Sequence, residues 1–206
     1  MAIGQEAALQ AIRSRFETRD KEFAESQPFV VLKWKIVEGS MAMANLRDGG
    51  SVIVGMSQRH GHFEATGISA GDLATYDPDD VMAAVNKYAK PPVELAAYPV
   101  EDERKTFLVI DALPFRRTPV MCSKAPPDNS GQKFKQGDIF ARTIERISTT
   151  RVADIGLLEE IIEIAAEKRA AEIIATARRI GLQMPAADAD AFAIERTRFS
   201  GMGDNA

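Results

Sequence analysis

The sequence predicts a mixed α/β domain, with a central mixed β-sheet flanked by helices and followed by a long C-terminal helix. Three observations lead to this fold class. A helical apolar pattern ends near Asn45, and a β-branched run at 52–54 follows two glycines and stops at Gly55. Such a run suits a strand that is covered on both faces. Apolar runs at 93–100 and 106–113 flank a charged turn, which predicts a β-hairpin. Residues 154–180 carry an unbroken helical pattern.

The N-terminal third predicts two helices around a short strand. Leu9, Ile12 and Phe16 recur at helical spacing, so residues 7–16 are expected to form an amphipathic helix that buries these three side chains. The polar stretch 17–25 alternates weakly around Phe23 and predicts a short edge strand. Pro28 suits a first helical turn, and a second helix is expected over 29–46.

The helix-to-strand connection is rich in residues that tolerate unusual backbone angles. Asn45, Gly49 and Gly50 are expected to take left-handed conformations there. After the central strand, residues 59–62 predict a turn into a strand over 63–68. Asp77 followed by Pro78 is a strong helix start, because an Asp cap and a proline in the first turn both suit it.

The C-terminal half predicts further strands at 120–123 and 138–143, separated by a mobile loop at 125–137. The last helix would extend about 40 Å at ~1.5 Å per residue, more than a domain of this size needs. We therefore expect it to project or to pack on a second copy, giving a homodimer. The expected organisation is a domain over 1–153, the helix over 154–181 and a flexible tail over 182–206.

Composition indicates a soluble protein of the cytoplasm. The chain has one cysteine, Cys122, which excludes an internal disulfide and is expected to be buried and inert. No apolar run approaches the ~20 residues that a membrane helix needs. His60 and His62 are the two histidines of the chain and lack a third ligand of matching type nearby, so we expect no metal site there.

Charge is distributed unevenly along the chain, although the formal net charge is −4. Residues 104–151 carry ten basic and four acidic residues, whereas residues 152–206 carry six basic and ten acidic ones. A local excess of this kind is typical of a polyanion site, and solvated loops produce it as well. The cations expected to contact phosphate are Arg116, Arg117, Lys133, Lys135, Arg142, Arg146 and Arg151. Phe134, between two lysines, either stacks on a base or pins its loop to the core.

Two segments resemble the Schlafen AlbA-like DNA-binding domain family. Residues 42–56, reading AMANLRDGGSVIVGM, resemble its "AFAN…GG…(L/I)GV" core. Residues 139–153, from Ile-Phe-Ala-Arg-Thr to the Ser-Thr-Thr run and Ala153, resemble its "vyvRtgssT..A" strand and helix entry. The likeness covers residues 16–154. An insertion at 144–146 makes Arg142 the firmer arginine to carry over. The resemblance implies a mixed α/β domain that binds nucleic acid.

Some members of that family cleave transfer RNA with three carboxylates and a divalent cation. Glu17 and Glu22 match the first two acids in spacing, although Ala24 stands where lysine is usual. No carboxylate follows Gly55, where the third is expected, and Asp111 is a further candidate for that position. Since a catalytic cation needs clustered anionic oxygens, the sequence favours binding without cleavage and without a cofactor.

Three functions stay open at this point. The first is a nucleic-acid-binding protein that grips the phosphate backbone through a basic strip. The second is a Mg²⁺- or Mn²⁺-dependent endoribonuclease that uses Glu17 and Glu22. The third is a homo-oligomeric scaffold that acts through its C-terminal helix. The sequence does not distinguish DNA from RNA, or a single strand from a duplex.

Overall fold

The computed structural model describes residues 4–143 and 147–182, and the chain divides into two compact units, Met1–Ala166 and Glu167–Ala206. The first unit has the predicted mixed α+β class, which is thereby confirmed. The elements of the described chain, in order, are α1 (Gln5–Ser14), β1 (Lys21–Ala24), α2 (Phe29–Ala44), β2 (Gly50–Val54), β3 (Met56–Arg59), β4 (His62–Ala65), α3 (Ala70–Leu73), α4 (Pro78–Asn86), β5 (Ala89–Lys90), β6 (Leu95–Asp102), β7 (Lys105–Ala112), β8 (Met121–Cys122), the 3₁₀ turn η1 (Asp128–Ser130), β9 (Phe140–Arg142), β10 (Thr149–Arg151) and α5 (Ile155–Arg179), which begins in the first unit and continues into the second.

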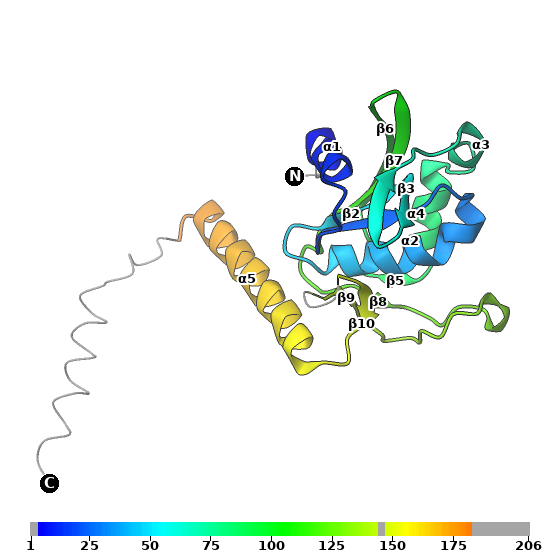
Figure 1. The fold of residues 1–206 in the computed structure, drawn as a ribbon. Helices are drawn as coiled ribbons and strands as arrows, with labels where there is room; N and C mark the ends of the chain where they lie inside the picture. Colours follow the sequence, from blue (N-terminus) through cyan, green and yellow to red (C-terminus); the bar gives the residue numbers. More distant parts are fainter. Residues whose placement is uncertain (1–3, 144–146, 183–206) are drawn as a thin grey trace, which may run out of the picture. The chain divides into compact units, whose positions relative to one another are not determined.

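The main sheet has the strand order β1-β2-β7-β6 (Figure 1). β1 runs parallel to β2, while β7 is antiparallel to both β2 and β6. Parallel neighbours need a crossover connection, and α2 supplies it between β1 and β2. The predicted central strand and the predicted hairpin of β6 and β7 are both confirmed.

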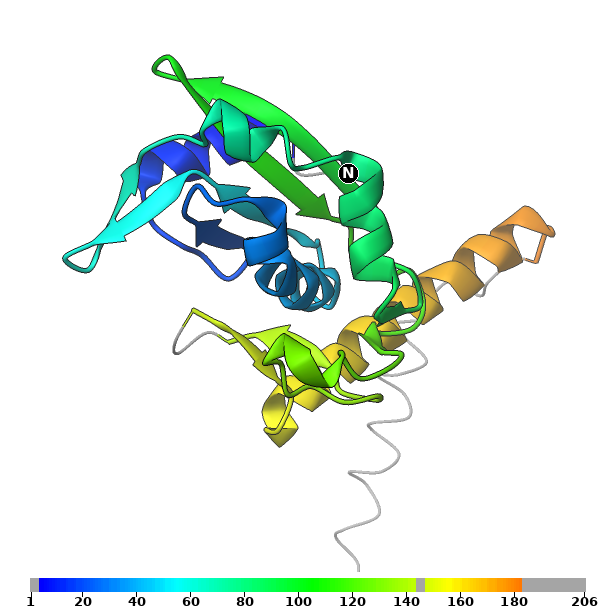
Figure 2. The same cartoon turned by 90° about the vertical axis from the view of Figure 1, so that its right-hand side faces the viewer.

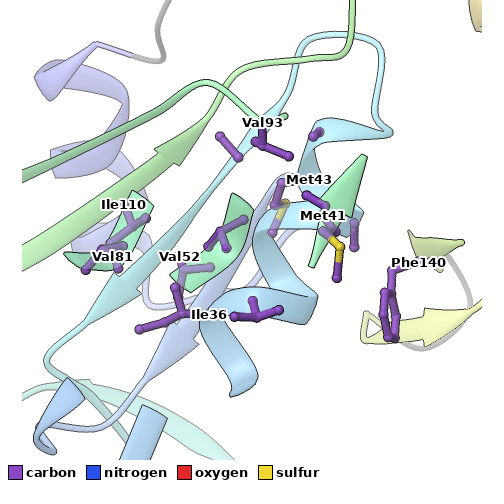
Figure 3. Close-up of a cluster of buried hydrophobic side chains, with 14 of the residues drawn as sticks. Ile36, Met41, Met43, Val52, Val81, Val93, Ile110 and Phe140 are labelled. Atoms are coloured by element: carbon purple, nitrogen blue, oxygen red, sulfur yellow. The ribbon is translucent and has the colours of Figure 1, made fainter. Parts of the chain in front are cut away.

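Apolar clusters lie on the two faces of this sheet. Phe23, Ile53 and Val109 belong to a cluster that includes residues of α1, and Val52 and Ile110 belong to one that includes residues of α2. Figure 3 shows Ile36 of α2 beside Val52, with Phe140 of β9 farther along the same cluster. In Figure 2, α2 lies between the main sheet and the β9–β10 hairpin. This explains why α2 is apolar on more than one side.

The small sheets of the first unit are the part that the sequence pattern did not predict. β3 pairs with β4, β5 with β8, and β9 with β10, each antiparallel. The strands β3, β5 and β10 and the short helix α3 are absent from the predicted elements. β10 reads Thr-Thr-Arg and has no apolar alternation, so its pairing depends on the neighbouring strand rather than on a local signal.

The long C-terminal helix is confirmed as α5. Its first backbone N–H groups, at Gly156 and Leu157, donate to the Asp154 side chain at 2.7 and 3.2 Å. Ile161 and Ile164 are buried. The second unit, as far as the structure describes it, comprises the rest of α5 and the residues to 182, with an Arg169–Glu172 ion pair of 3.0 Å. The expected flexible tail over 182–206 lies outside the described residues except for Leu182, and the three-part domain division stays a prediction.

The turn between α2 and β2 differs from the expectation. Gly49 is left-handed, with φ of 80°, but Asn45 has a right-handed φ of −87° and Gly50 has no positive φ. Gly50 is required for space instead, because a Cβ there would lie 2.2 Å from the sulfur of Met43. The left-handed conformation predicted for Asn45 and Gly50 is therefore wrong.

Two side chains of the basic segment face the core. Phe134 is 4% exposed and lies edge-on to Trp34, Tyr88 and Phe140, so it pins its loop and is unavailable for stacking. Cys122 is buried as predicted, and burial raises the pKa of its thiol to about 12.

Among the described helices, none is both long and apolar enough to cross a membrane.

Asn45 binds three backbone groups of two residues that are far from it in sequence. Its amide donates to the carbonyls of Val120 and Phe140, both at 2.9 Å, and its side-chain oxygen accepts the Val120 N–H at 2.7 Å. All of these groups are buried. Asn45→Ala should lower the free energy of unfolding by about 2–4 kcal/mol, because each orphaned buried group costs about 1–3 kcal/mol.

Urea denaturation measures this change. Asp48→Ala, at an exposed position in the following turn, is the control and should change stability by less than about 0.5 kcal/mol. Equal effects of the two substitutions would show that the Asn45 bridge contributes nothing.

Candidate functional site: a polar pocket beside the β9–β10 hairpin

A polar pocket of about 440 Å³ opens where β1, α2 and the β9–β10 hairpin meet. Acidic, basic and hydroxyl side chains dominate its lining, which comprises Glu17, Glu22, Trp34, Lys35, Glu38, Gln132, Arg142, Ile147, Ser148 and Thr149. The two acids singled out by sequence, Glu17 and Glu22, are thus brought together.

Glu22 is the most deeply placed of these acids, with a side chain 11% exposed. Its Oε2 lies 3.2 Å from Nη1 of Arg142 and accepts the Thr149 hydroxyl at 3.0 Å. Its Oε1 lies 3.7 Å from Nζ of Lys35. Every oxygen of the carboxylate therefore faces a positive charge or a donor, as a buried acid requires.

Arg142 is an internal side chain and not a surface cation. It is 1% exposed. Nε donates to the carbonyl of Arg19 at 3.1 Å, and Nη2 donates to those of Thr18 and Lys21, both at 3.3 Å. The guanidinium is therefore saturated by the chain itself, and a phosphate has no access to it in this conformation.

Gly39 gives the Glu22 carboxylate its place against α2. A Cβ at Gly39 would lie 2.9 Å from Oε2 of Glu22 and 3.2 Å from Val52. Glycine inside a helix is unfavourable by about 1 kcal/mol relative to alanine. Here the helix backbone approaches the sheet closely enough that the acid fits only without a side chain at this position.

Glu17 lies between the pocket and its rim. Its Oε1 accepts the backbone N–H of Phe23 at 2.7 Å. The carbonyl of Phe23 in turn accepts a hydrogen bond from Nζ of Lys35 at 2.5 Å. Burial raises the pKa of Glu17, and the Phe23 N–H and the charge of Arg142 partly oppose this rise. Glu17 is therefore half-buried and Glu22 buried, so neither is a solvated charge on the surface of the edge strand.

Glu38 is a pocket acid that sequence reasoning missed. Burial raises its pKa, the charge of Glu22 raises it further, and Arg151 lowers it. Glu38 lies one helical turn after Trp34, on a helix whose pattern indicates packing alone. A polar residue inside an otherwise apolar helix was the available signal.

Asp111, proposed as the third acid, lies on the other face of the sheet. It pairs with Ser51 across β2, and Ser51 pairs with Lys21, whereas Glu22 pairs with Val52. Paired residues point to the same face and successive residues to opposite faces, so Asp111 and Glu22 point apart. Asp111 instead accepts the Tyr98 hydroxyl at 2.8 Å. It therefore does not complete a carboxylate cluster with Glu22, and that candidate assignment is wrong.

The remaining predicted cations fall into two groups. Lys133, Lys135 and Arg151 are linked to one another and to Asp138 through backbone groups of the two lysines and the Arg151 side chain, and we call these three residues the cation patch. Nη1 of Arg151 lies 3.5 Å from Oδ2 of Asp138 and donates to the Lys133 carbonyl at 3.4 Å. Oδ2 of Asp138 also accepts the backbone N–H of Lys135 at 2.7 Å.

Arg116 and Arg117 form the second group, at an apolar pocket of about 270 Å³. Arg116 pairs there with Glu94 at 2.6 Å. Arg146 lies outside the described residues. The seven predicted cations therefore do not form one continuous strip in the part of the chain that the structure describes, because Arg142 is internal and the others divide into these two groups.

Within residues 4–143 and 147–182, no three His, Cys, Asp or Glu side chains are grouped so as to hold a metal ion. His60 and His62 are exposed at the β3–β4 turn. In the pocket, Arg142, Thr149 and Lys35 already contact the Glu22 oxygens that a cation would need.

Comparisons with known proteins give likenesses of fold. No protein-family model and no curated protein matches the sequence. The DIP2311 protein from Corynebacterium diphtheriae is similar in structure, with 16% identity and a TM-score of 0.47 over 76% of this chain and 28% of that one. The N-terminal domain of a RecG-related protein from Nitrosomonas europaea is also similar, with 16% identity and a TM-score of 0.42. This match covers 65% of this chain and 88% of that domain. This chain thus spans about a quarter of DIP2311, and the functional argument rests on its own residues.

The raised pKa of Glu38 makes stability depend on pH. When a carboxyl group has a higher pKa in the folded protein than in the unfolded chain, its ionisation destabilises the folded protein. This penalty is absent at a pH where the carboxyl is protonated in both the folded and the unfolded protein. Glu38→Gln should therefore raise the free energy of unfolding near pH 7. The gain should vanish below about pH 4, where glutamate is protonated even in the unfolded chain.

Urea denaturation across this pH range measures the effect. Glu25→Gln, at an exposed position just after β1, is the control and should shift stability by less than about 0.5 kcal/mol. A gain for Glu38→Gln that persists unchanged at low pH would contradict the electrostatic explanation.

Proposed function

We propose that this protein binds nucleic acid through the cation patch and the adjoining polar pocket, and that it does not cleave its ligand. One observation carries the proposal: the cation patch lies next to the pocket. The charge of Arg151 acts on Glu38 in the pocket, and Gln132, which lines the pocket, precedes Lys133 directly.

The patch is open to a polyanion. Lys133 and Lys135 are exposed, and the Arg151 side chain is 51% exposed. The Arg151–Asp138 contact is a surface ion pair, of a kind that contributes about 0–1 kcal/mol. A phosphate oxygen can therefore replace Asp138 as the partner of Arg151 at little cost, which is how cations position a nucleic-acid backbone without reading its sequence.

The acids of the pocket are compatible with a polyanion nearby. Glu22 faces Arg142 and Lys35, so its negative charge is compensated within the protein. The resemblance to the Schlafen AlbA-like family supports the same class of ligand, with Arg142 now placed as an internal anchor of the binding surface.

A metal-dependent endoribonuclease is the second candidate, because Glu17, Glu22 and Glu38 line one pocket. The contacts of Arg142 and Thr149 with Glu22 argue against it, since a cation would have to displace them. Cleavage of transfer RNA that needs Mg²⁺ or Mn²⁺ and is lost in Glu22→Gln would favour this candidate over binding alone.

Homodimer formation through α5 stays a separate proposal. In the first unit, Ile155 and Ile162 of this helix are 70% and 54% exposed. Large apolar side chains in such positions are typical of a helix that another surface covers. This scaffold function is compatible with nucleic-acid binding, because the cation patch lies on other elements.

Salt titration tests the binding proposal. The logarithm of affinity should fall linearly with the logarithm of salt concentration, by about 0.9 per phosphate contacted on duplex DNA and about 0.7 on a single strand. Lys133→Gln, Lys135→Gln and Arg151→Gln should each weaken binding and reduce this slope by about one such increment. Fluorescence anisotropy with labelled DNA and RNA oligonucleotides measures both quantities.

Arg104→Gln is the matched control. Arg104 is exposed in the turn between β6 and β7 and belongs to the same basic stretch of sequence. The Arg104→Gln substitution removes the same charge as each substitution in the patch. An equal loss of affinity for Arg104→Gln would therefore show that net charge alone, and not the patch, determines affinity. Absence of binding to every oligonucleotide at low salt would refute the proposed function.

A further inference from the structure

A second hollow, of about 670 Å³, opens beside the polar pocket. The residues after α1 and the β3–β4 hairpin form its walls. Its lining comprises Ser14, Arg15, Phe16, Glu17, Gly61, His62, Phe63, Glu64 and Ile147. Glu17 and Ile147 line both hollows. The two hollows therefore adjoin at these residues, and we call the second one the Phe16 groove.

Phe16 is 71% exposed in this groove, although helical spacing predicts it on the buried face of the first helix. The helix ends earlier than expected, at Ser14. Arg15 has a left-handed φ of 56° and donates its N–H to the carbonyl of Ala11 at 3.2 Å. This turn carries the chain out of the helix, so Phe16 does not follow Ile12 into the core.

An exposed aromatic ring in a hollow fits a planar apolar partner. The opposite wall is firm, because Phe63 packs edge-on against Phe23 with ring centroids 5.0 Å apart. Burying a phenylalanine is strongly favourable, so a ring left in solvent gains most when a ligand covers it. Nucleic-acid bases stack on such rings whatever their sequence.

The charges around the Phe16 groove suit a nucleotide. Arg15 and His62 are exposed in its lining, and Glu64 lies 3.7 Å from Arg59. The Phe16 groove adjoins the polar pocket at Glu17, and that pocket lies beside the cation patch. A strand whose phosphates contact the patch would therefore have its neighbouring bases directed along the groove. Bases within a duplex are stacked on each other, and so only an unpaired base can occupy it.

We propose that the Phe16 groove receives an unpaired base, which stacks on the Phe16 ring, so that the ligand is single-stranded. This inference rests on the proposed function and specifies its ligand class. Stacking on Phe16 supplies affinity without salt dependence, whereas the cation patch supplies the salt-dependent part.

Binding of a labelled oligothymidylate of about 12 nucleotides tests the inference against a DNA hairpin whose stem has about the same length and whose loop is a non-nucleotide linker, so that it offers no unpaired base. Phe16→Ala should weaken binding of the single strand about 5- to 150-fold, the range that corresponds to stacking of one base. It should leave the slope with salt and the affinity for the hairpin unchanged. Phe16→Tyr, which keeps the ring, should bind the single strand about as tightly as the unchanged protein.

Val30→Ala is the matched control, since Val30 is 76% exposed on α2 and lines neither hollow. Unchanged affinity of Phe16→Ala for the single strand, while substitutions in the cation patch weaken it, would overturn the stacking inference and leave the proposed function standing. Equal weakening for single strand and hairpin would also overturn it.

Two other results would be decisive. If Phe16→Ala converts a dimer into a monomer by light scattering and leaves single-strand affinity unchanged, the groove covers a second copy of the chain and the inference fails. If the unchanged protein binds neither oligonucleotide at low salt, the proposed function fails first. The two failures are thereby distinguishable.

Discussion

The buried ion pair between Arg142 and Glu22 is the contact on which the arrangement of the first unit depends. Moving two charges out of water is costly, and the interior repays this only with good geometry and further hydrogen bonds. Arg142 meets that condition through the carbonyls of three residues between Thr18 and Lys21. One guanidinium thus fixes β9 to the segment that leads into β1, across more than 100 residues of sequence.

The same contact separates the charges of the binding surface. Glu22 is satisfied internally, and the Thr149 hydroxyl of β10 donates to it. Two residues later, on the same face of that strand, Arg151 reaches the surface beside Asp138. A protein with a net charge of −4 can therefore present a local positive surface. In the proposed binding mode, Phe16 in the adjoining hollow adds a contact that does not depend on charge.

Local signals in the sequence predicted much of the fold. The Val-Ile-Val run, the Asp77 cap, the β6–β7 hairpin and α5 are each specified within a few residues, and all are present. Tertiary contacts determine the rest. A motif placed Arg142 in the functional site, but only folding shows that backbone carbonyls saturate it. The signal for Glu38 is only a polar residue inside an otherwise apolar helix, and β10 has no local signal. Phe16 follows the helical spacing of buried residues, but the helix ends before it.

A double-mutant cycle on the free energy of unfolding tests the central claim most directly. Arg142→Met should destabilise the protein by about 3–5 kcal/mol, because it leaves Glu22 buried without its partner. In the double variant that also carries Glu22→Gln, the total loss of unfolding free energy should be smaller than the sum of the two single losses by about 0.5–3 kcal/mol. Losses that add within about 0.5 kcal/mol would contradict the account, since the two side chains would then act independently.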